Sequence, residues 1–227
     1  MQTDAHLLTL VRPLPVDQAM HPPLAPVIAD TRSYFDRYRR VVAELPHSEI
    51  ERVVDLLHQT YQERRRVFLF GNGGSAALAS HFACDLSKGT VNAAAEKRFR
   101  VLALTDNIPL ITAWANDTAY DQIFAEQLQN FIEPGDVAFG ISGSGCSPNV
   151  LMALQVARQA QAITVGLTGF KGGKLPQLCE FCVVIPSDNM QIIEDLQLGI
   201  THAIFTVIRH RISQEFSSQA SCTALAA

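Results

Sequence analysis

The sequence predicts an α/β fold, a three-layer doubly wound sandwich built on a five-stranded parallel sheet, from three observations. Five short segments are almost continuously apolar and rich in Val, Ile and Phe, which is typical of parallel strands buried on both faces. Segments with apolar residues at helical spacing alternate with them. Two of the strands run into turns rich in glycine and serine that precede a helix. In such sheets, ligands bind beyond the carboxyl ends of the strands, where the strand order reverses.

The first thirty residues contain five prolines and no sustained hydrophobic period, so we expect a flexible arm there. Two helices are expected next, over residues 31–45 and 48–65. Ser48 and Glu51 match a capping box at the start of the second helix. We therefore expect one domain over residues 31–213, preceded by the arm at 1–30 and followed by a tail at 214–227.

The remaining elements are expected to alternate along the chain. Strands are predicted at residues 67–70, 100–104, 137–141, 163–167 and 181–185. Helices are predicted at residues 76–86, 108–114 with 120–130, 148–160, 175–178 and 190–212. No internal repeat and no low-complexity tract interrupts this order.

The composition is that of a globular chain with a sizeable core. Of its 227 residues, 48% are hydrophobic and 18% are charged, and no apolar run is long enough to cross a bilayer. The formal net charge of −4 argues against a broad nucleic-acid surface. The beginning of the chain lacks the pattern of a secretory signal, and the five cysteines show no disulfide framework. We therefore expect a cytoplasmic protein with neither membrane nor nucleic-acid partners.

Cys179 and Cys182 form a C-x-x-C pattern, which has two interpretations. One is a redox pair, but the helix N-terminal setting that lowers a thiol pKa in such pairs is missing. The other is a structural role, because Cys182 opens an apolar run in which cysteine behaves as a small core hydrophobe. We favour the structural interpretation.

Two turns have the composition of phosphate holders, GNGGS at 71–75 and SGSGCS at 142–147. Each precedes a helix, whose N-terminus offers free N–H groups and partial positive charge to an anion. Neither turn contains the lysine of a P-loop or the G-x-G-x-x-G spacing, so no nucleotide cofactor is expected. One such turn alone would be a tight connection, whereas two after separate strands favour a phosphate site. A third Gly-rich turn, at 168–173, either lines the same cleft or only turns the chain.

Four residues on two predicted helices have chemistry to offer. His81 and Asp85 stand four residues apart and share a helix face, which suits acid/base work or a metal, although a core histidine and a surface charge are equally good interpretations. Glu194 and His202 stand eight residues apart, which is about 12 Å along a helix with a rotation of about 80°. Either the helix is irregular near Glu194, or the two residues serve different parts of a site, or different subunits supply them.

Taken together, the motifs of this chain resemble the sugar isomerase (SIS) domain family, and within it the phosphoheptose isomerases. The resemblance covers residues 31–213. Its carriers are GNGGS at 71–75, HFACDL at 81–86, ALTDN at 103–107, AND at 115–117, GDVAFGISGSGCSPNV at 135–150, LTGFKGGKL at 167–175 and IIEDLQLGITH at 192–202. The fold expected from the resemblance is the flavodoxin-like SIS sandwich with additional N-terminal helices.

The resemblance implies an aldose–ketose isomerase that interconverts sedoheptulose 7-phosphate and D-glycero-D-manno-heptose 7-phosphate through an enediol. It implies Asp85 and His202 as the acid/base pair. The substrate-binding residues that it implies are Asn72, Gly73, Gly74, Ser75, Asp106, Ser142, Gly143, Ser144, Ser147 and Glu194. The metal ligands that it implies, with Zn²⁺ as the ion of some family members, are His81, Asp85, Glu194 and His202.

This chain departs from the family pattern at positions that bear on the chemistry. Asp85 stands where the family has glutamate, and Glu194 stands where it has glutamine. The family usually forms homotetramers with active sites at subunit interfaces, and a dimer is the alternative. A rival function is that of a non-catalytic SIS protein, a sugar-phosphate sensor or an assembly factor of the replication-initiator-binding type. Retention of His81, Asp85 and His202 argues against that rival.

Overall fold

The computed structural model describes residues 28–91 and 97–225, and the side chains as far as residue 215. Its centre is a five-stranded parallel sheet with the strand order β2-β1-β3-β4-β5. The strands are β1 (Arg66–Gly71), β2 (Arg100–Ala103), β3 (Val137–Ser142), β4 (Ile163–Thr168) and β5 (Phe181–Val184). Each lies within one residue of its expected bounds, and the predicted fold class is confirmed.

The strand order reverses between β1 and β3. From β1 the chain passes to β2 at one edge, then returns to pair β3 with the other side of β1. The register pairs Val67 with Val137 and Gly71 with Ile141. The carboxyl ends of β1 and β3 therefore lie side by side, at the position where doubly wound sheets bind ligands.

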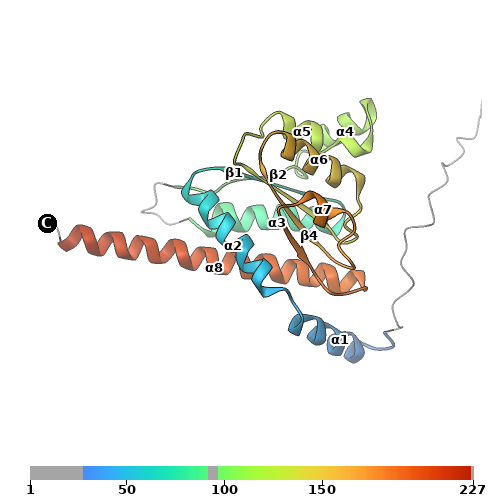
Figure 1. Ribbon diagram of the computed structural model, residues 1–227, viewed down its shortest axis with the longest axis horizontal. Coiled ribbons are helices and arrows are strands. Elements are labelled where there is room, and N and C mark those ends of the chain that lie inside the picture. Colours follow the sequence, from blue (N-terminus) through green and yellow to red (C-terminus); the bar gives the residue numbers. More distant parts are fainter. Residues whose placement is uncertain (1–27, 92–96, 226–227) are drawn as a thin grey trace, which may run out of the picture.

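Helices cover both faces of the sheet (Figure 1). On one face lie α2 (His47–Gln62), α3 (Gly74–Cys84) and α8 (Met190–Leu225); on the other lie α4 (Ile108–Asp117), α5 (Ala125–Gln129), α6 (Pro148–Gln159) and α7 (Leu175–Leu178). Side chains of β1 alternate between the two cores, since Val67 and Leu69 join the first and Phe68 and Phe70 join the second. Burial on both faces explains why the strands are continuously apolar.

The helix ends differ in places from those expected. The helix α2 begins at His47 behind Pro46, and Ser48 bonds the Glu49 side chain, so the predicted capping box with Glu51 is wrong. Proline at the cap position offers no side-chain acceptor, and Ser48 already lies inside the first turn. A capping box occurs instead at the start of α1 (Thr31–Ala43), between Asp30 and Ser33.

The last helix is longer than expected. We predict a helix over 190–212, whereas α8 continues to Leu225 and passes through the expected boundary between domain and tail. The expected helix over 120–130 is a short 3₁₀ turn, η3 (Tyr120–Gln122), followed by α5. Residues 1–27 of the predicted arm lie outside the described residues, and the domain boundaries stay predictions. No helix in the described ranges is long and apolar enough to cross a membrane.

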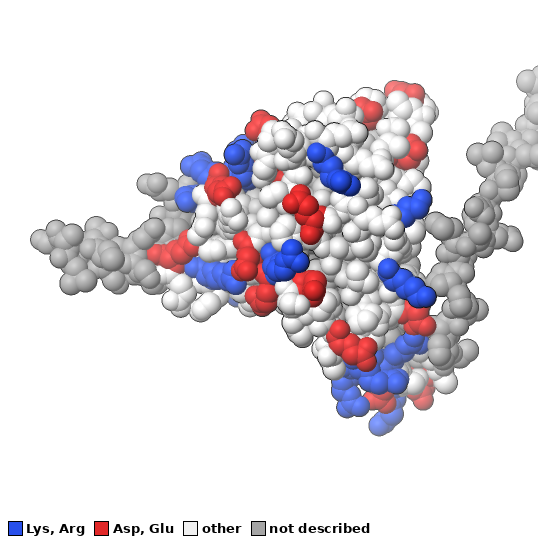
Figure 2. Space-filling model, viewed as in Figure 1, with Lys and Arg blue, Asp and Glu red and all other residues white. Residues whose placement is uncertain are grey.

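On the face shown in Figure 2, basic and acidic side chains lie close together, and both gather over α1. An ion pair joins Arg37 of α1 to Asp188 in the loop before α8, and another joins Arg211 of α8 to Asp55 of α2. That the protein has no nucleic-acid partner stays a prediction.

A buried carboxylate joins the amino ends of β1 and β3. Asp136, which is 1% exposed, accepts hydrogen bonds from the backbone N–H of Arg66 (2.8 Å), the Arg66 Nε–H (2.9 Å) and the backbone N–H of Glu133 (3.0 Å). Three donors compensate for the loss of water around this charge. Asp136 therefore holds the two central strands together at the end opposite the Gly/Ser turns.

Replacing this carboxylate should destabilise the whole domain. Asp136→Ala leaves two backbone N–H groups without their acceptor and removes one of the two carboxylates that pair with the partly exposed Arg66 guanidinium, and we expect the free energy of unfolding to fall by about 3 kcal/mol. Urea denaturation followed by circular dichroism measures the change. The matched control is Glu133→Ala, because the Glu133 side chain is exposed and pairs with the same arginine. Equal losses in the two variants would contradict the role given to Asp136.

Candidate active site

The first Gly/Ser turn connects β1 to α3 and needs glycine at two positions. A Cβ added to Gly71 would lie 2.7 Å from the carbonyl oxygen of Ile141, and Gly73 has a φ of +54°. The helix α3 begins at Gly74, and the backbone N–H of Ser75 bonds the carbonyl of Asn72 (3.0 Å). The free N–H groups of the helix start thus lie at the carboxyl end of the sheet.

The second turn is held in shape by its own serines. Ser142 Oγ lies 3.1 Å from Ser147 Oγ and accepts a hydrogen bond from the backbone N–H of Gly145 (3.2 Å). Ser144 Oγ accepts one from the backbone N–H of Cys146 (3.3 Å). Ser142 is buried, whereas Ser144 and Ser147 keep part of their surface open to solvent. The turn therefore keeps hydroxyl groups available beside the first turn.

The third Gly-rich turn supports the second. The backbone N–H of Gly169 bonds the carbonyl of Gly143 (3.0 Å), and that of Lys174 bonds the carbonyl of Gly145 (2.8 Å). A Cβ on Gly145 would lie 2.0 Å from the Gly172 carbonyl oxygen, so only glycine permits this approach. The turn at 168–173 therefore does more than reverse the chain, because it and Lys174 bind the backbone of the serine turn at 142–147.

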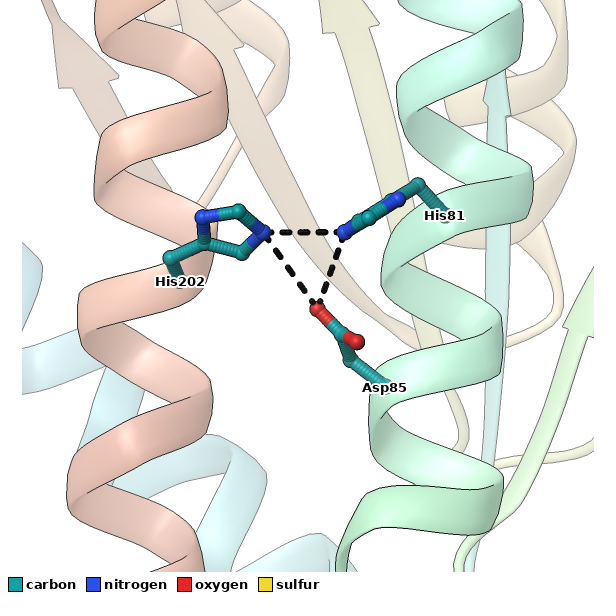
Figure 3. A group of neighbouring side chains, drawn as sticks. All are labelled: His81, Asp85 and His202. Atoms are coloured by element: carbon teal, nitrogen blue, oxygen red, sulfur yellow. Dashed lines mark hydrogen bonds and ion pairs between the residues drawn. The ribbon is translucent and has the colours of Figure 1, made fainter.

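A group of three side chains lies between α3 and α8 (Figure 3). His81 Nε2 is 2.9 Å from His202 Nε2. Asp85 Oδ2 is 3.4 Å from His81 Nε2 and 3.7 Å from His202 Nε2. The shared helix face expected for His81 and Asp85 is confirmed, and one chain is enough to bring His202 to both.

The backbone changes from an α-helix to a π-helical turn at Asp85. The helix α3 ends at Cys84, and the chain continues as a π-helical turn over Asp85–Gly89, a widening that is frequent at functional sites. The turn lies close against α8, because a Cβ on Gly89 would come 2.5 Å from the ring of Phe205. Phe82 and Leu86 are fully buried and fix α3 and the turn on the sheet.

The donor set of this group fits a metal ion. Asp85 Oδ2 is shielded from solvent, and no hydrogen bond from any described residue reaches it. A buried carboxylate oxygen without a hydrogen bond needs another partner. The ligand atoms of His81, Asp85 and His202 all lie within 4.8 Å of one another. Two imidazoles and one carboxylate form the ligand set of many catalytic zinc sites.

Glu194 does not lie in this group. Its carboxylate lies over the start of α3, where a Cβ added to Gly74 would come 3.1 Å from Glu194 Oε1. Of the alternatives for the eight-residue spacing, the structure therefore favours separate parts of one site for Glu194 and His202.

A groove of about 270 Å³ runs between α3 and α8 from Gly74 and Glu194 to His81. Its lining residues are Gly74, Ala77, Leu78, His81, Glu194, Asp195, Gln197 and Leu198. The start of α3, beside the Gly/Ser turns, is thus connected by an open path to one of the two histidines.

Asp106 lies at the carboxyl end of β2, beside α3. It accepts a hydrogen bond from Ser80 Oγ, and Thr105 Oγ1 lies 3.3 Å from its carboxylate. Ser80 directly precedes His81 in α3, so the Asp106 carboxylate lies against that part of the helix. The sequence did not predict three residues that form hydrogen bonds with residues of the site, because an isolated polar residue gives no local signal. They are Ser80, Asn149 and Tyr120.

The structural interpretation of the two nearby cysteines agrees with their surroundings. Burial raises the pKa of Cys182 to about 11 and raises that of Cys179 as well, to which the neighbouring Cys182 also contributes. A thiol with a raised pKa forms little thiolate at neutral pH and is a poor redox group. Both sulfurs pack around Gly166, where a Cβ would lie 3.0 Å from Cys179 Sγ.

Comparison with known proteins gives a consistent picture. The model of the SIS domain family matches residues 33–169. A phosphoheptose isomerase of Aliarcobacter butzleri is 37% identical over 173 residues, which are 76% of this chain and 90% of that protein.

Two solved structures extend this likeness to the fold. The phosphoheptose isomerase from Neisseria gonorrhoeae superposes with a TM-score of 0.71 at 28% identity, covering 78% of this chain and 95% of that one. The one from Francisella tularensis gives 0.72 at 28% identity, covering 79% and 96%. The chain therefore belongs to the SIS domain family and, within it, to the phosphoheptose isomerases.

Proposed function

We propose that this protein converts sedoheptulose 7-phosphate into D-glycero-D-manno-heptose 7-phosphate. The observation that carries the proposal is the His81–Asp85–His202 group, which lies along α3 from two Gly/Ser turns suited to a phosphate. The named relatives are phosphoheptose isomerases, and their sequences align with most of this chain.

The geometry of α3 favours a long phosphosugar. Gly74, at the helix start, and His81 are seven residues apart, which corresponds to about 10 Å along the helix axis. An anion held at the helix start and a carbonyl held near His81 must therefore be joined by an extended carbon chain. In a heptose 7-phosphate the reacting carbons, C1 and C2, lie at the opposite end of the molecule from the phosphate.

The reaction requires one proton shift between carbons and one between oxygens. We assign Asp85 as the base that takes a proton from C1 of the ketose and returns it to C2 of the enediol. We assign His202 as the partner that takes the proton of O1 and delivers one to O2. Ser75, Ser142, Ser144 and Ser147 hold the phosphate, together with the backbone of Gly73, Gly74 and Gly143.

We also propose that the site holds Zn²⁺, with His81, Asp85 and His202 as ligands. If His202 bound the ion through Nε2, its Nδ1 would be the atom left for the proton transfer between O1 and O2, and Asp85 would keep one carboxylate oxygen as the base. The Asp85 oxygen that accepts no hydrogen bond and the mixed imidazole and carboxylate donors support this assignment. When bound, the ion would polarise the sugar carbonyl as a Lewis acid. Glu194 lies at the other end of the groove, so it would not be among the ligands of the ion.

Removing the acid/base pair should abolish turnover without unfolding the protein. We expect Asp85→Asn and His202→Ala to lower kcat by about 100-fold or more, because each removes one proton-transfer group. A coupled assay with sedoheptulose 7-phosphate measures the loss, with circular dichroism as the check on folding. Matched controls are Asp36→Asn on α1 and His210→Ala on α8, both exposed.

Full turnover in folded Asp85→Asn and His202→Ala variants would reject this mechanism. Tight binding of the sugar phosphate without turnover in the natural sequence would favour the non-catalytic SIS protein instead. The two results separate a wrong assignment of residues from a wrong assignment of function.

Zinc uptake should depend on His81. After dialysis against a chelator, we expect added Zn²⁺ to bind at one ion per chain and to raise both Tm and turnover. His81→Ala should lose this uptake, measured by calorimetry and by metal analysis, while His210→Ala keeps it. Unchanged zinc affinity in His81→Ala would contradict the assignment of His81 as a zinc ligand.

We propose in addition a cytoplasmic homotetramer with active sites near subunit interfaces. Phe35 of α1 and Leu198 of the groove expose apolar surface that a neighbouring subunit would cover, which supports the assembly. Free thiols are typical of a reducing compartment, which supports the cytoplasm; they are those of Cys84, Cys146, Cys179 and Cys182. Light scattering after gel filtration should give about four times the chain mass of 24.9 kDa. A monomer at assay concentration would contradict the assembly.

A further inference from the structure

A reciprocal pair of amides joins the two Gly/Ser turns across the point where the strand order reverses. Asn72 follows β1, and Asn149 follows the turn after β3. Asn72 Nδ2 donates to Asn149 Oδ1, and Asn149 Nδ2 donates to Asn72 Oδ1, both at 2.8 Å. Asn149 is 1% exposed, whereas Asn72 is half-buried. The buried partner therefore determines how the more accessible amide is oriented.

Two further hydrogen bonds fix the orientation of both amides. The backbone N–H of Val150 donates to Asn149 Oδ1 (2.9 Å), so this oxygen cannot exchange places with its nitrogen without losing two bonds. The hydroxyl of Tyr120 donates to Asn72 Oδ1 (3.0 Å). An amide oxygen has two acceptor sites, and Asn149 and Tyr120 occupy both of them on Asn72. An amide nitrogen has two N–H groups, of which Asn149 takes one.

We propose that Asn149 and Tyr120 are positioning residues that make Asn72 a hydrogen-bond donor toward the sugar. The remaining N–H of Asn72 would bind an acceptor oxygen on the sugar chain near its phosphate, and the Asn72 oxygen would accept nothing from the substrate. This inference rests on the proposed function, because it deepens the role of a residue in the same site.

Tyr120 is the part of this network that a mutation can change most cleanly. Its ring is 59% exposed and comes from η3, on the opposite face of the sheet from α3, so the fold does not depend on its hydroxyl. Tyr120→Phe removes one hydrogen bond to Asn72 Oδ1 and leaves the ring. Asn149 would still bond both ends of the Asn72 amide, but the Asn72 oxygen would be held by one hydrogen bond fewer, so the remaining N–H would be less firmly oriented toward the substrate.

The test compares two probes in a double-mutant cycle. Calorimetry is run with sedoheptulose 7-phosphate and with inorganic phosphate on the wild type, Tyr120→Phe, Asn72→Ala and the double variant. We expect Tyr120→Phe to weaken sugar-phosphate binding about five-fold, the effect of one hydrogen bond, and to leave inorganic phosphate binding unchanged. In the Asn72→Ala background, Tyr120→Phe should have no further effect, because Tyr120 acts through Asn72. Tyr38→Phe, on α1, is the matched control.

Unchanged sugar-phosphate affinity in Tyr120→Phe overturns the inference. So does a loss of affinity in the double variant that equals the product of the losses in the two single variants. An equal loss for inorganic phosphate also overturns it, because Tyr120 would then support the loops in general. A wild type that binds the sugar phosphate without turnover overturns the isomerase proposal, while the binding ratios still decide the role of Tyr120. If the wild type turns over the substrate and Tyr120→Phe has the same affinities as the wild type for both probes, only the inference about Tyr120 is overturned.

Discussion

The pairing of β1 with β3 is the constraint on which the rest of the site depends. At their amino ends the buried carboxylate of Asp136 binds the backbone and side chain of Arg66. At their carboxyl ends the two amides of Asn72 and Asn149 bond each other. The strands are held in one register between these two sets of hydrogen bonds. That register brings the two Gly/Ser turns and the starts of α3 and α6 together. The two Gly/Ser turns lie side by side only because the strands beneath them are neighbours.

The second determinant is the contact between α3 and α8. Both helices pack on the same face of the sheet, with Phe82 and Ile204 in its core. Gly89 lets the π-helical turn that begins at Asp85 approach Phe205 of α8 closely. The same contact leaves the groove that leads from the Gly/Ser turns to His81. The Gly/Ser turns and the His81–Asp85–His202 group thus lie toward opposite ends of α3.

The two departures from the family pattern have different structural consequences. Asp85 has one methylene less than glutamate, yet its Oδ2 lies 3.4 Å from the His81 imidazole and 3.7 Å from that of His202. Glu194 replaces a neutral amide with a charge, and its carboxylate lies at the start of α3, where the helix dipole favours an anion. The added charge therefore stands near the loops rather than at the histidines.

The sequence by itself determined the five strands, the two Gly/Ser turns and the shared face of His81 and Asp85. These features follow from hydrophobic period, turn chemistry and helix geometry, all of which are local. It misplaced the start of α2, because Pro46 starts the helix before Ser48 can cap it. Only the tertiary structure decided that His202 meets His81 while Glu194 does not, and that Tyr120 and Asn149 fix Asn72. Those contacts join segments between 48 and 121 residues apart, and their geometry depends on strand order and helix packing, which local patterns do not contain.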